Sequence, residues 1–451
     1  MIRRGYLLVA AVIAAVVAPG TAASATATAP GSSGHAPSTP IQHLVVMTQD
    51  QHSFDNYFGT RPGVDGIPAK ACVPAADKGK PCIAPFAIDK HQSQVRLRMS
   101  AAAEAIAVDG GRMDGFARAQ RGLQAASAAA MGYYRPEDVP ALTALADRAV
   151  LFDRWFASVP GGTIPNRLFG IAAQTKGDVG SVPAAGWASM PVIFDRLQAA
   201  GISWRIYVQN YEPALTIKTA SAKARAGGQI ARVPLLAMPR FTRNPALSGH
   251  IVDMRQYFSD LAQGRLPAVS YVVSTSSTER LPTTTGSGEN PITTVVNALI
   301  SSSAWPVSAF VLDYDSAGGW YDHFGPPVVK GARLGMRVPA MVISPYATPH
   351  TTNHTTLDAS AVLKFIEGNW HLAPLTSRDR DAGNLAAALD FRQPPSQPVL
   401  VDVAPHGSSV AQPSSITLYL GYGVAAAVAA LAIGWAFQGR GRRLGLEGTN
   451  P

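Results

Sequence analysis

The chain has 451 residues, of which 47% are hydrophobic and 15% charged, and its formal net charge is +9. This apolar content is enough for a sizeable core, and the length allows one large α/β domain or two or three ordinary ones. A basic balance suits nucleic acid, anionic lipid or phosphate-bearing partners. Because the arginines are scattered and no nucleic-acid-binding motif occurs, we exclude a nucleic-acid partner.

The N-terminal segment has the pattern of an export signal. Arg3 and Arg4 precede an apolar run over 7–17, and the small residues 23–25 offer a cleavage site. The paired arginines suit a twin-arginine signal as well as an ordinary secretory one. We therefore expect a signal peptide over 1–25, followed by a Pro/Gly/Ser/Ala-rich linker over 26–40.

Short apolar runs then alternate with helical patterns. The runs suited to buried strands are 41–47, 149–152, 204–208, 268–273, 309–312 and 340–343. Helical spacing occupies 191–200, 293–301 and 359–370. This alternation predicts one α/β domain over 41–405, with a mostly parallel sheet covered by helices on both faces.

Cys72 and Cys82, the two cysteines of the chain, lie in one loop rich in Pro, Gly and Lys. In an oxidising compartment such a pair favours a local disulfide. A zinc site is the weaker alternative, because such sites usually have four ligands and closer cysteine pairs.

The C-terminal part predicts a membrane anchor. A linker over 406–415 leads into 416–437, which contains no Asp, Glu, Lys or Arg and is long enough to cross a bilayer core of about 30 Å. Arg440, Arg442 and Arg443 follow, and basic residues favour the cytoplasmic side. We expect a transmembrane helix over 416–437, a cytoplasmic tail over 438–451 and the α/β domain outside the cell.

Three segments follow predicted strands, where ligands of open α/β sheets bind. Asp50 and Gln51 offer a carboxylate and an amide oxygen for a divalent cation, although a capped helix start explains them as well. Thr163 follows two glycines, so it is either a hydroxyl nucleophile at a helix start or a cap after an ordinary turn. Asp313 and Asp315 can share one face and hold a cation with His323 nearby, or belong to a solvated loop.

Taken together, these segments resemble the bacterial phosphoesterase family of non-haemolytic phospholipases C and related acid phosphatases. Residues 49–59 read Gln-Asp-Gln-His-Ser-Phe-Asp-Asn-Tyr-Phe-Gly, close to the family's Gln-Glu-Asn-Arg-Ser-Phe-Asp-His-Tyr-Phe-Gly. Matching blocks continue in order at 112–116, 131–134, 163–167, 194–197, 201–204, 264–267, 318–323, 337–340, 342–346, 363–367, 376–379 and 389–391. The resemblance covers about residues 41–393 and implies an alkaline-phosphatase-like fold that hydrolyses phosphoric esters.

The resemblance also implies roles for individual residues. Thr163 stands for the nucleophile, His323 and His354 for proton-transferring histidines, and Asn166 and loosely His91 for substrate-binding residues. The implied ligands of one divalent metal ion are Asp50, Gln51, Asp315 and Ser316.

The chain departs from the family pattern in this metal site. Asp50 replaces a glutamate, Gln51 an asparagine and Ser316 a second acidic ligand, so both reach and negative charge change. Asp313 is a substitute ligand on the same face as Asp315, and Arg280 replaces a histidine and adds a cation that binds phosphate.

Two functions are consistent with this sequence. The first is an extracellular, membrane-anchored and metal-assisted phosphoesterase acting on phospholipid or another phosphate ester through Thr163. The alternative is a pseudoenzyme of the same fold that binds a phosphate-bearing ligand or an envelope partner without turnover. A sulfatase-like or phosphonate hydrolase activity ranks below both, because the motif blocks match the phospholipase C group.

Overall fold

The structure is a computed structural model that describes residues 35–88, 95–123, 126–175, 180–274 and 291–402. The predicted signal peptide, C-terminal linker, transmembrane helix and tail lie outside these residues, as do His91 and Arg280. Within the described ranges, none of the helices combines the length and apolarity needed to cross a bilayer.

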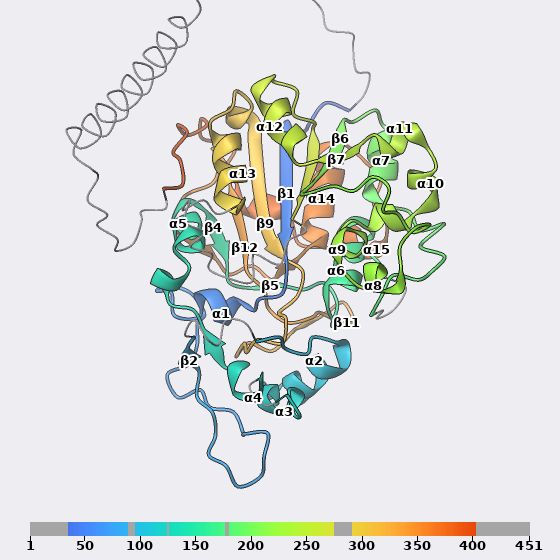
Figure 1. Cartoon of the computed structure of the whole chain (residues 1–451). Coiled ribbons are helices and arrows are strands. Elements are labelled where there is room, and N and C mark those ends of the chain that lie inside the picture. The colour runs from blue at the N-terminus through green and yellow to red at the C-terminus, as the bar shows by residue number, and fades with distance from the viewer. Residues whose placement is uncertain (1–34, 89–94, 124–125, 176–179, 275–290, 403–451) are drawn as a thin grey trace, which may run out of the picture.

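A mixed eight-stranded sheet forms the centre of the molecule (Figure 1). Its order is β13 (Thr351–Asn353), β4 (Val150–Phe152), β12 (Ala340–Ile343), β9 (Ser308–Tyr314), β1 (His43–Gln49), β8 (Val269–Val273), β6 (Trp204–Val208) and β7 (Ile251–Asp253). β12 is antiparallel to both neighbours, and every other pair is parallel. The predicted mostly parallel sheet is thus confirmed, and each of the six predicted runs overlaps a strand of this sheet.

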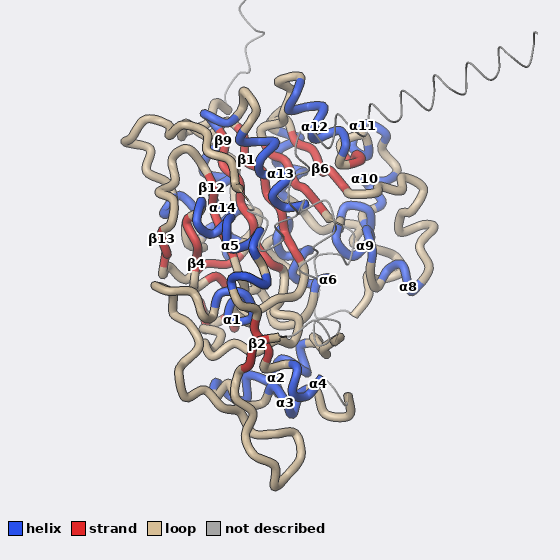
Figure 2. Tube along the Cα trace, turned by 60° about the vertical axis from the view of Figure 1, so that its left-hand side comes forward, coloured by secondary structure: helices blue, strands red, loops and turns tan. Residues whose placement is uncertain are grey.

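Helices pack on both faces of this sheet (Figure 2). On one face, Phe194 of α7 (Ile193–Ala199) stacks near Trp204 and Tyr271, with ring centroids 4.7 and 5.1 Å away. On the other, Tyr257 of α12 (Arg255–Ala262) lies 5.3 Å from the ring of Tyr207. Since neighbouring strand residues point to opposite faces, a strand covered on both sides needs apolar residues at successive positions, as Ile206, Tyr207 and Val208 of β6 are.

The remaining helices are short. They are α1 (Phe54–Phe58), α2 (Ala101–Val108), α3 (Phe116–Ala119), α4 (Ala126–Ala129), α5 (Pro140–Arg148), α6 (Thr163–Ala172), α8 (Ala222–Arg225), α9 (Gly228–Arg232), α10 (Pro239–Thr242), α11 (Pro245–Ser248), α13 (Pro291–Ile300), α14 (Ser360–Asn369) and α15 (Ser377–Arg380). Three small sheets pair β10 (Val328–Val329) with β11 (Ala332–Arg333), β14 (Leu357–Asp358) with β5 (Trp155–Phe156), and β2 (Phe86–Ala87) with β3 (Gly132–Tyr133).

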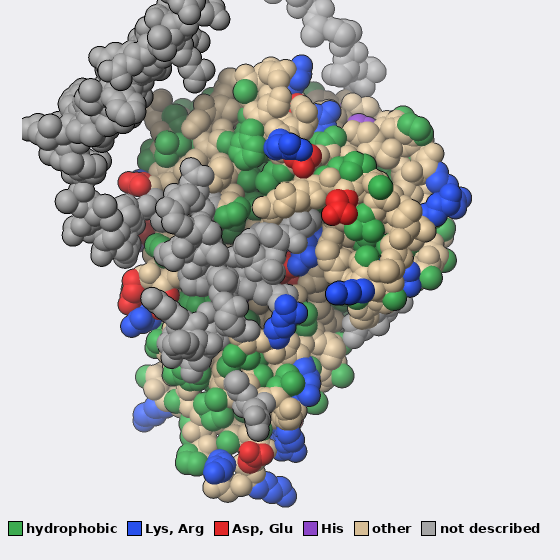
Figure 3. Space-filling view, viewed as in Figure 1, with side chains coloured by type: hydrophobic (Ala, Val, Ile, Leu, Met, Phe, Trp, Pro, Cys, Tyr) green, Lys and Arg blue, Asp and Glu red, His purple; other side chains and the backbone are tan. Residues whose placement is uncertain are grey.

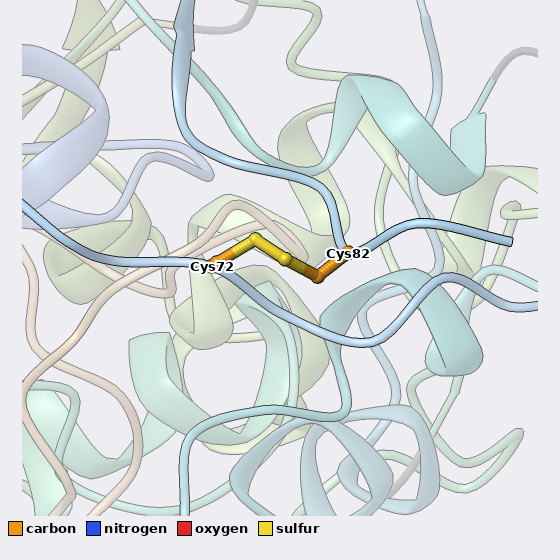
Figure 4. The surroundings of a disulfide bond; sticks show 2 residues. All are labelled: Cys72 and Cys82. Atoms are coloured by element: carbon orange, nitrogen blue, oxygen red, sulfur yellow. A yellow bond between two sulfur atoms is a disulfide. The ribbon is translucent and has the colours of Figure 1, made fainter.

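A smaller lobe lies beyond the carboxyl ends of β1 and β9 and contains α2, α3, α4 and the β2–β3 pair (Figure 1). A long loop protrudes from it, and the predicted disulfide between Cys72 and Cys82 is present there, with Cα atoms 5.6 Å apart (Figure 4). An antiparallel bridge between Val73 and Ile83 continues the pairing of the two loop arms. The disulfide thus joins the two arms next to this backbone bridge.

The last residues of the predicted linker 26–40 contact the domain. Thr39 donates its backbone N–H and its hydroxyl to Asn369 Oδ1 at 3.1 and 2.7 Å. His35 Nδ1 lies 3.1 Å from the carbonyl oxygen of Trp370. Residues 35–40 therefore lie along the C-terminal end of α14.

A buried carboxyl pair joins α14 to α15 and predicts a pH-dependent stability. Glu367, which is 4% exposed, accepts from Leu375 N–H at 3.1 Å and shares a hydrogen bond with Asp379. Burial, together with the bond and charge of Asp379, raises the pKa of Glu367 to about 9. Glu367 is thus protonated at neutral pH and donates to Asp379.

The substitution Glu367→Gln keeps a donor for Asp379 and an acceptor for Leu375. Because the folded-state pKa of Glu367 is raised, its cost to stability grows as pH rises from about 4.5 to about 9. We expect the variant to be more stable than wild type by about 1–3 kcal/mol at pH 7–8 and equal to it below pH 4.5. Urea unfolding at both pH values measures this, with Glu137→Gln at an exposed site as control. A gain of the same size at both pH values would contradict it.

Candidate active site

The carboxylates of Asp50 and Asp315 meet at the carboxyl ends of neighbouring strands. Asp50 follows β1 and Asp315 follows β9, and the backbone N–H of Asp315 donates to Gln49 O at 2.9 Å. Both residues are buried, at 6% and 4% exposure. The parallel register of β1 and β9 therefore brings together residues from distant parts of the sequence.

Two arginines hold these carboxylates. Arg167 of α6 donates from Nη2 to Asp50 Oδ1 at 2.8 Å and from Nε to Asp315 Oδ2 at 2.9 Å. Arg232, the last residue of α9, donates to Asp50 Oδ2 from Nε at 2.8 Å and also from Nη2. We call Asp50, Arg167, Arg232 and Asp315 the arginine–carboxylate cluster.

The two aspartates of the cluster differ in protonation. Burial would raise the pKa of Asp50, but the charges and hydrogen bonds of Arg167 and Arg232 outweigh it and lower the pKa to about 2. Burial and the charge of Asp50 raise the pKa of Asp315 to about 7, against the opposing charge of Arg167. Asp50 is therefore ionised throughout the neutral range, whereas Asp315 titrates within it.

Thr163 stands next to this cluster as the first residue of α6. Its side chain is partly exposed, and Gln51 Nε2 donates to its Oγ1 at 3.5 Å. Residues four apart on a helix share a face, so the Thr163 hydroxyl lies one turn from Arg167 on the same side of α6. The structure thus brings the predicted nucleophile and Gln51 together, beside Asp50 and Asp315.

The turn before Thr163 is fixed by Asn166. Asn166 Oδ1 accepts from Val159 N–H at 3.1 Å, and its Nδ2 donates to the carbonyls of Val159 and Gly162, both at 3.1 Å. Its side chain is 5% exposed. Asn166 therefore positions the turn before Thr163, and its predicted contact with substrate stays a prediction.

The two other predicted ligands are Ser316 and Asp313. Ser316 Oγ donates to Asp315 Oδ1 at 2.9 Å. Asp313 is buried in β9, and its Oδ1 has no hydrogen-bond partner. Burial raises the pKa of Asp313 to about 6 despite a hydrogen bond from Thr48. Asp313 lines a cavity under the cluster together with Tyr271, Arg167 and Arg232.

The two predicted catalytic histidines belong to a second network, centred on Arg337. Arg337 is fully buried and donates to Asp55 at 2.8 Å and to Asp322 at 3.0 Å. His323 Nδ1 lies 2.8 Å from Asp55, and His354 Nδ1 lies 2.9 Å from Asp153, whose carbonyl oxygen accepts from Arg337. Among the described residues, neither histidine shares a hydrogen bond with Thr163 or with the arginine–carboxylate cluster.

His323 is held in this network by its hydrogen bonds to Asp55. Burial would lower the pKa of His323, but the hydrogen bond and charge of Asp55 outweigh it and raise the pKa. His354 keeps 57% of its side chain exposed. His354 is therefore the more accessible of the two, whereas His323 is tied to the protein interior.

Two groups of side chains have the residue types of a divalent-cation site. Asp55, Asp322 and His323 place ligand atoms within 4.8 Å of one another, a composition compatible with a metal ion. Arg337 donates to both of these carboxylates.

The second group is the metal site expected from the sequence. There, each oxygen of Asp50 and Asp315 accepts from Arg167, Arg232 or Ser316. The expected ligand set therefore does not fit a divalent cation, because guanidinium groups already compensate its charge.

Sequence reasoning passed over the residues that make these networks. Arg167 lay inside the recognised block 163–167, and its spacing of four from Thr163 was the available signal. Arg232 ends a short helix 182 residues from Asp50 and carries no local signal. Asp55 and Arg337 lay in the recognised blocks 49–59 and 337–340, but their contact with each other is seen only in the folded chain.

The fold and site define an α/β protein with a hydroxyl at a helix start beside buried arginines, at the carboxyl edge of a mixed sheet. The model of the Phosphoesterase family matches residues 41–373, and the chain belongs to this family. The expected family is thus confirmed.

Relatives of known name are phospholipases C of bacteria and plants. Phospholipase C A of Mycobacterium tuberculosis is 28% identical over 432 residues, covering 79% of each chain. Non-specific phospholipase C1 of Arabidopsis thaliana is 27% identical, covering 79% of this chain and 72% of its own. A solved protein in the alkaline phosphatase superfamily from Vibrio parahaemolyticus matches 77% of this chain and 71% of its own, at 11% identity and a TM-score of 0.35.

Proposed function

We propose that this protein hydrolyses phosphoric esters with Thr163 as the nucleophile. One observation carries the proposal: the partly exposed Thr163 begins α6 one turn before the buried Arg167, which meets the partly buried Arg232 at Asp50, at the carboxyl edge of the sheet. A helix N-terminus and guanidinium groups both favour a bound phosphate. Membership of the Phosphoesterase family and the phospholipase C relatives support this substrate class.

The proposed reaction has two steps. Thr163 Oγ gives up its proton and forms a bond to phosphorus while the ester P–O bond breaks, and the leaving alkoxide takes up one proton, so that the number of protons is unchanged. Water then cleaves the bond between threonine and phosphorus, releasing the phosphate product and restoring the hydroxyl. A histidine, His323 or His354, stays the predicted proton donor to the leaving alcohol. No step passes through a metal, because guanidinium groups already bond both carboxylates.

We further propose that the reaction takes place outside the cytoplasmic membrane, on a phospholipid or another phosphate ester. The signal pattern of 1–25, the apolar segment 416–437 and the Cys72–Cys82 disulfide support this location. On the face shown in Figure 3, Lys and Arg side chains are dispersed. Protease treatment of intact cells should remove the domain but not a tag placed after residue 451.

The full chain in detergent tests the activity. Chromogenic phosphodiester, phosphomonoester, phosphonate and sulfate esters are offered in parallel, with the Thr163→Ala chain, purified identically, as blank. We expect turnover above the blank for a phosphoric ester. Equal rates for both proteins on every ester would overturn the proposal, and turnover of the sulfate or phosphonate ester alone would favour the lower-ranked reading.

The second candidate function is a pseudoenzyme that binds a phosphate-bearing ligand. It is favoured by the arginine–carboxylate cluster, in which every carboxylate oxygen already has a donor from this chain. Calorimetric titration with inorganic phosphate, together with the ester assay, separates the two functions. Saturable binding without turnover above the blank would identify the pseudoenzyme.

Gly318 lets the loop after Asp315 approach the site closely, which leads to a prediction. Gly318 has φ +65°, and a Cβ there would lie 2.2 Å from the carbonyl oxygen of Gln51, whose own φ is +66°. The substitution Gly318→Ala must therefore displace Gln51, which contacts Thr163. We expect ester hydrolysis to fall by about 10- to 100-fold.

The matched control for this prediction is Gly368→Ala. Gly368 lies in α14, where an added Cβ meets no atom within 4 Å. Initial-rate assays of both variants at equal protein concentration give the comparison. Wild-type rates in Gly318→Ala would show that the position of Gln51 does not matter for the reaction.

A further inference from the structure

We infer that the guanidinium of Arg167 takes the place of a divalent cation between Asp50 and Asp315, so that this site holds no metal ion. The catalytic part of this inference rests on the proposed function, whereas the metal-free state of the site does not. The inference contradicts the sequence-based prediction that a divalent metal ion binds at this site.

The positions of the two carboxylates around Arg167 support this inference. Two carboxylates from neighbouring strand ends converge on one planar cation, at 2.8 Å from Asp50 and 2.9 Å from Asp315. A metal bridging them would have to bind oxygens that now face guanidinium nitrogens. Arg167 is 7% exposed and sits in the first turns of α6, so moving it away would leave the buried Asp315 without a cation and Asp50 with Arg232 alone.

The formal charge of the arginine–carboxylate cluster also supports the inference. The cluster contains two aspartates and two arginines, so its formal charge is zero before any ion binds. Adding a divalent cation would leave an excess of two positive charges in a buried place, which is unfavourable. Ser316, which donates to Asp315 Oδ1, supplies no further negative charge.

The arrangement also explains how a phosphate would be held without a metal. Thr163 and Arg167 lie one turn apart on the same face of α6, and Gln51, which follows Asp50, contacts the Thr163 hydroxyl. Arginine presents several donors in a fixed plane that matches phosphate oxygens. Arg232 adds a second cation from α9 and is also nearly buried, with 11% of its side chain exposed.

Thermal unfolding of the full chain in detergent tests the inference without measuring turnover. Wild type is measured after EDTA treatment and in millimolar Mn²⁺, Ca²⁺ or Zn²⁺, and its metal content is determined by elemental analysis. We expect no stoichiometric metal and a Tm that shifts by less than about 2 °C with EDTA or ions. Stoichiometric metal, or a Tm that depends on an ion, would overturn the inference.

Substitution of Arg167 should create the missing cation site. In Arg167→Met the two carboxylates lose their shared cation, and we expect a lower Tm that one of the divalent ions raises by at least about 2 °C. Arg167→Lys keeps the charge and should show no such response. The double variant Arg167→Met/Asp50→Asn loses one carboxylate and should lose the response too.

A folded Arg167→Met chain that is indifferent to all three ions would overturn the inference, because Asp50 and Asp315 would then not form a cation position. If Arg167→Met does not fold, the wild-type metal content and Tm still decide. Failure of the ester assay would refute the proposed function alone, since none of these measurements requires turnover.

Discussion

Thr163→Ala is expected to lower kcat/KM for ester hydrolysis by about 10³-fold or more, while leaving the fold intact. The hydroxyl is the atom proposed to bond phosphorus, and the neighbouring arginines cannot replace it as a nucleophile. The side chain makes one long hydrogen bond, 3.5 Å from Gln51, and the helix N-cap is Gly162 rather than Thr163. Its loss should therefore change Tm by no more than about 2 °C.

Two controls make this result specific. Thr163→Ser keeps a hydroxyl in place and should retain activity within about 10-fold of wild type. Thr348→Ala removes an exposed threonine and should behave as wild type. Initial rates over a substrate series give kcat and KM for each protein. Retention of most of the kcat in Thr163→Ala would refute its role as nucleophile.

The sheet could be predicted from the sequence because its strands are buried on both faces. The runs 204–208 and 340–343 coincide with β6 and β12, since a mainly apolar run of strand length fits a strand that is covered on both faces. Asp50 and Asp315 could also be placed, because both follow such runs and neighbouring strands end at one edge.

The partners of these aspartates could not be predicted in the same way. Arg232 reaches Asp50 from α9, whose sequence Gly-Gln-Ile-Ala-Arg reads as an ordinary short helix. The metal expected on Asp50 was inferred from ligand types and from the family resemblance, and neither reveals a guanidinium that bonds the same oxygens. Electrostatic compensation depends on contacts between distant segments, which single-sequence patterns do not encode.

Arg337→Met is expected to lower the free energy of unfolding by about 3–5 kcal/mol. Arg337 is fully buried and bonds Asp55 and Asp322, which are 1% and 0% exposed. It also donates to the carbonyl oxygens of Asp65 at 2.8 Å and Asp153 at 3.0 Å. Methionine keeps the volume of the stem but leaves two buried carboxylates without their cation.

Neutralising one of those carboxylates should recover part of the loss. Burial and the charge of Asp55 already raise the pKa of Asp322 to about 6 despite Arg337, so removing Arg337 favours its protonated form further. The double variant Arg337→Met/Asp322→Asn should therefore be more stable at pH 7 than Arg337→Met alone. The difference should shrink below pH 4, where Asp322 is protonated in the folded and the unfolded chain.

Urea unfolding at pH 7 and pH 4 measures both effects. Arg392→Met is the matched control, because 91% of the Arg392 side chain is exposed and its contacts are with Asp390 in the same turn. Its effect should stay within about 0.5 kcal/mol. A loss below about 1 kcal/mol in Arg337→Met would mean that Asp55 and Asp322 do not depend on this arginine. The positions of the side chains in the network around His323 would then be determined by packing rather than by charge.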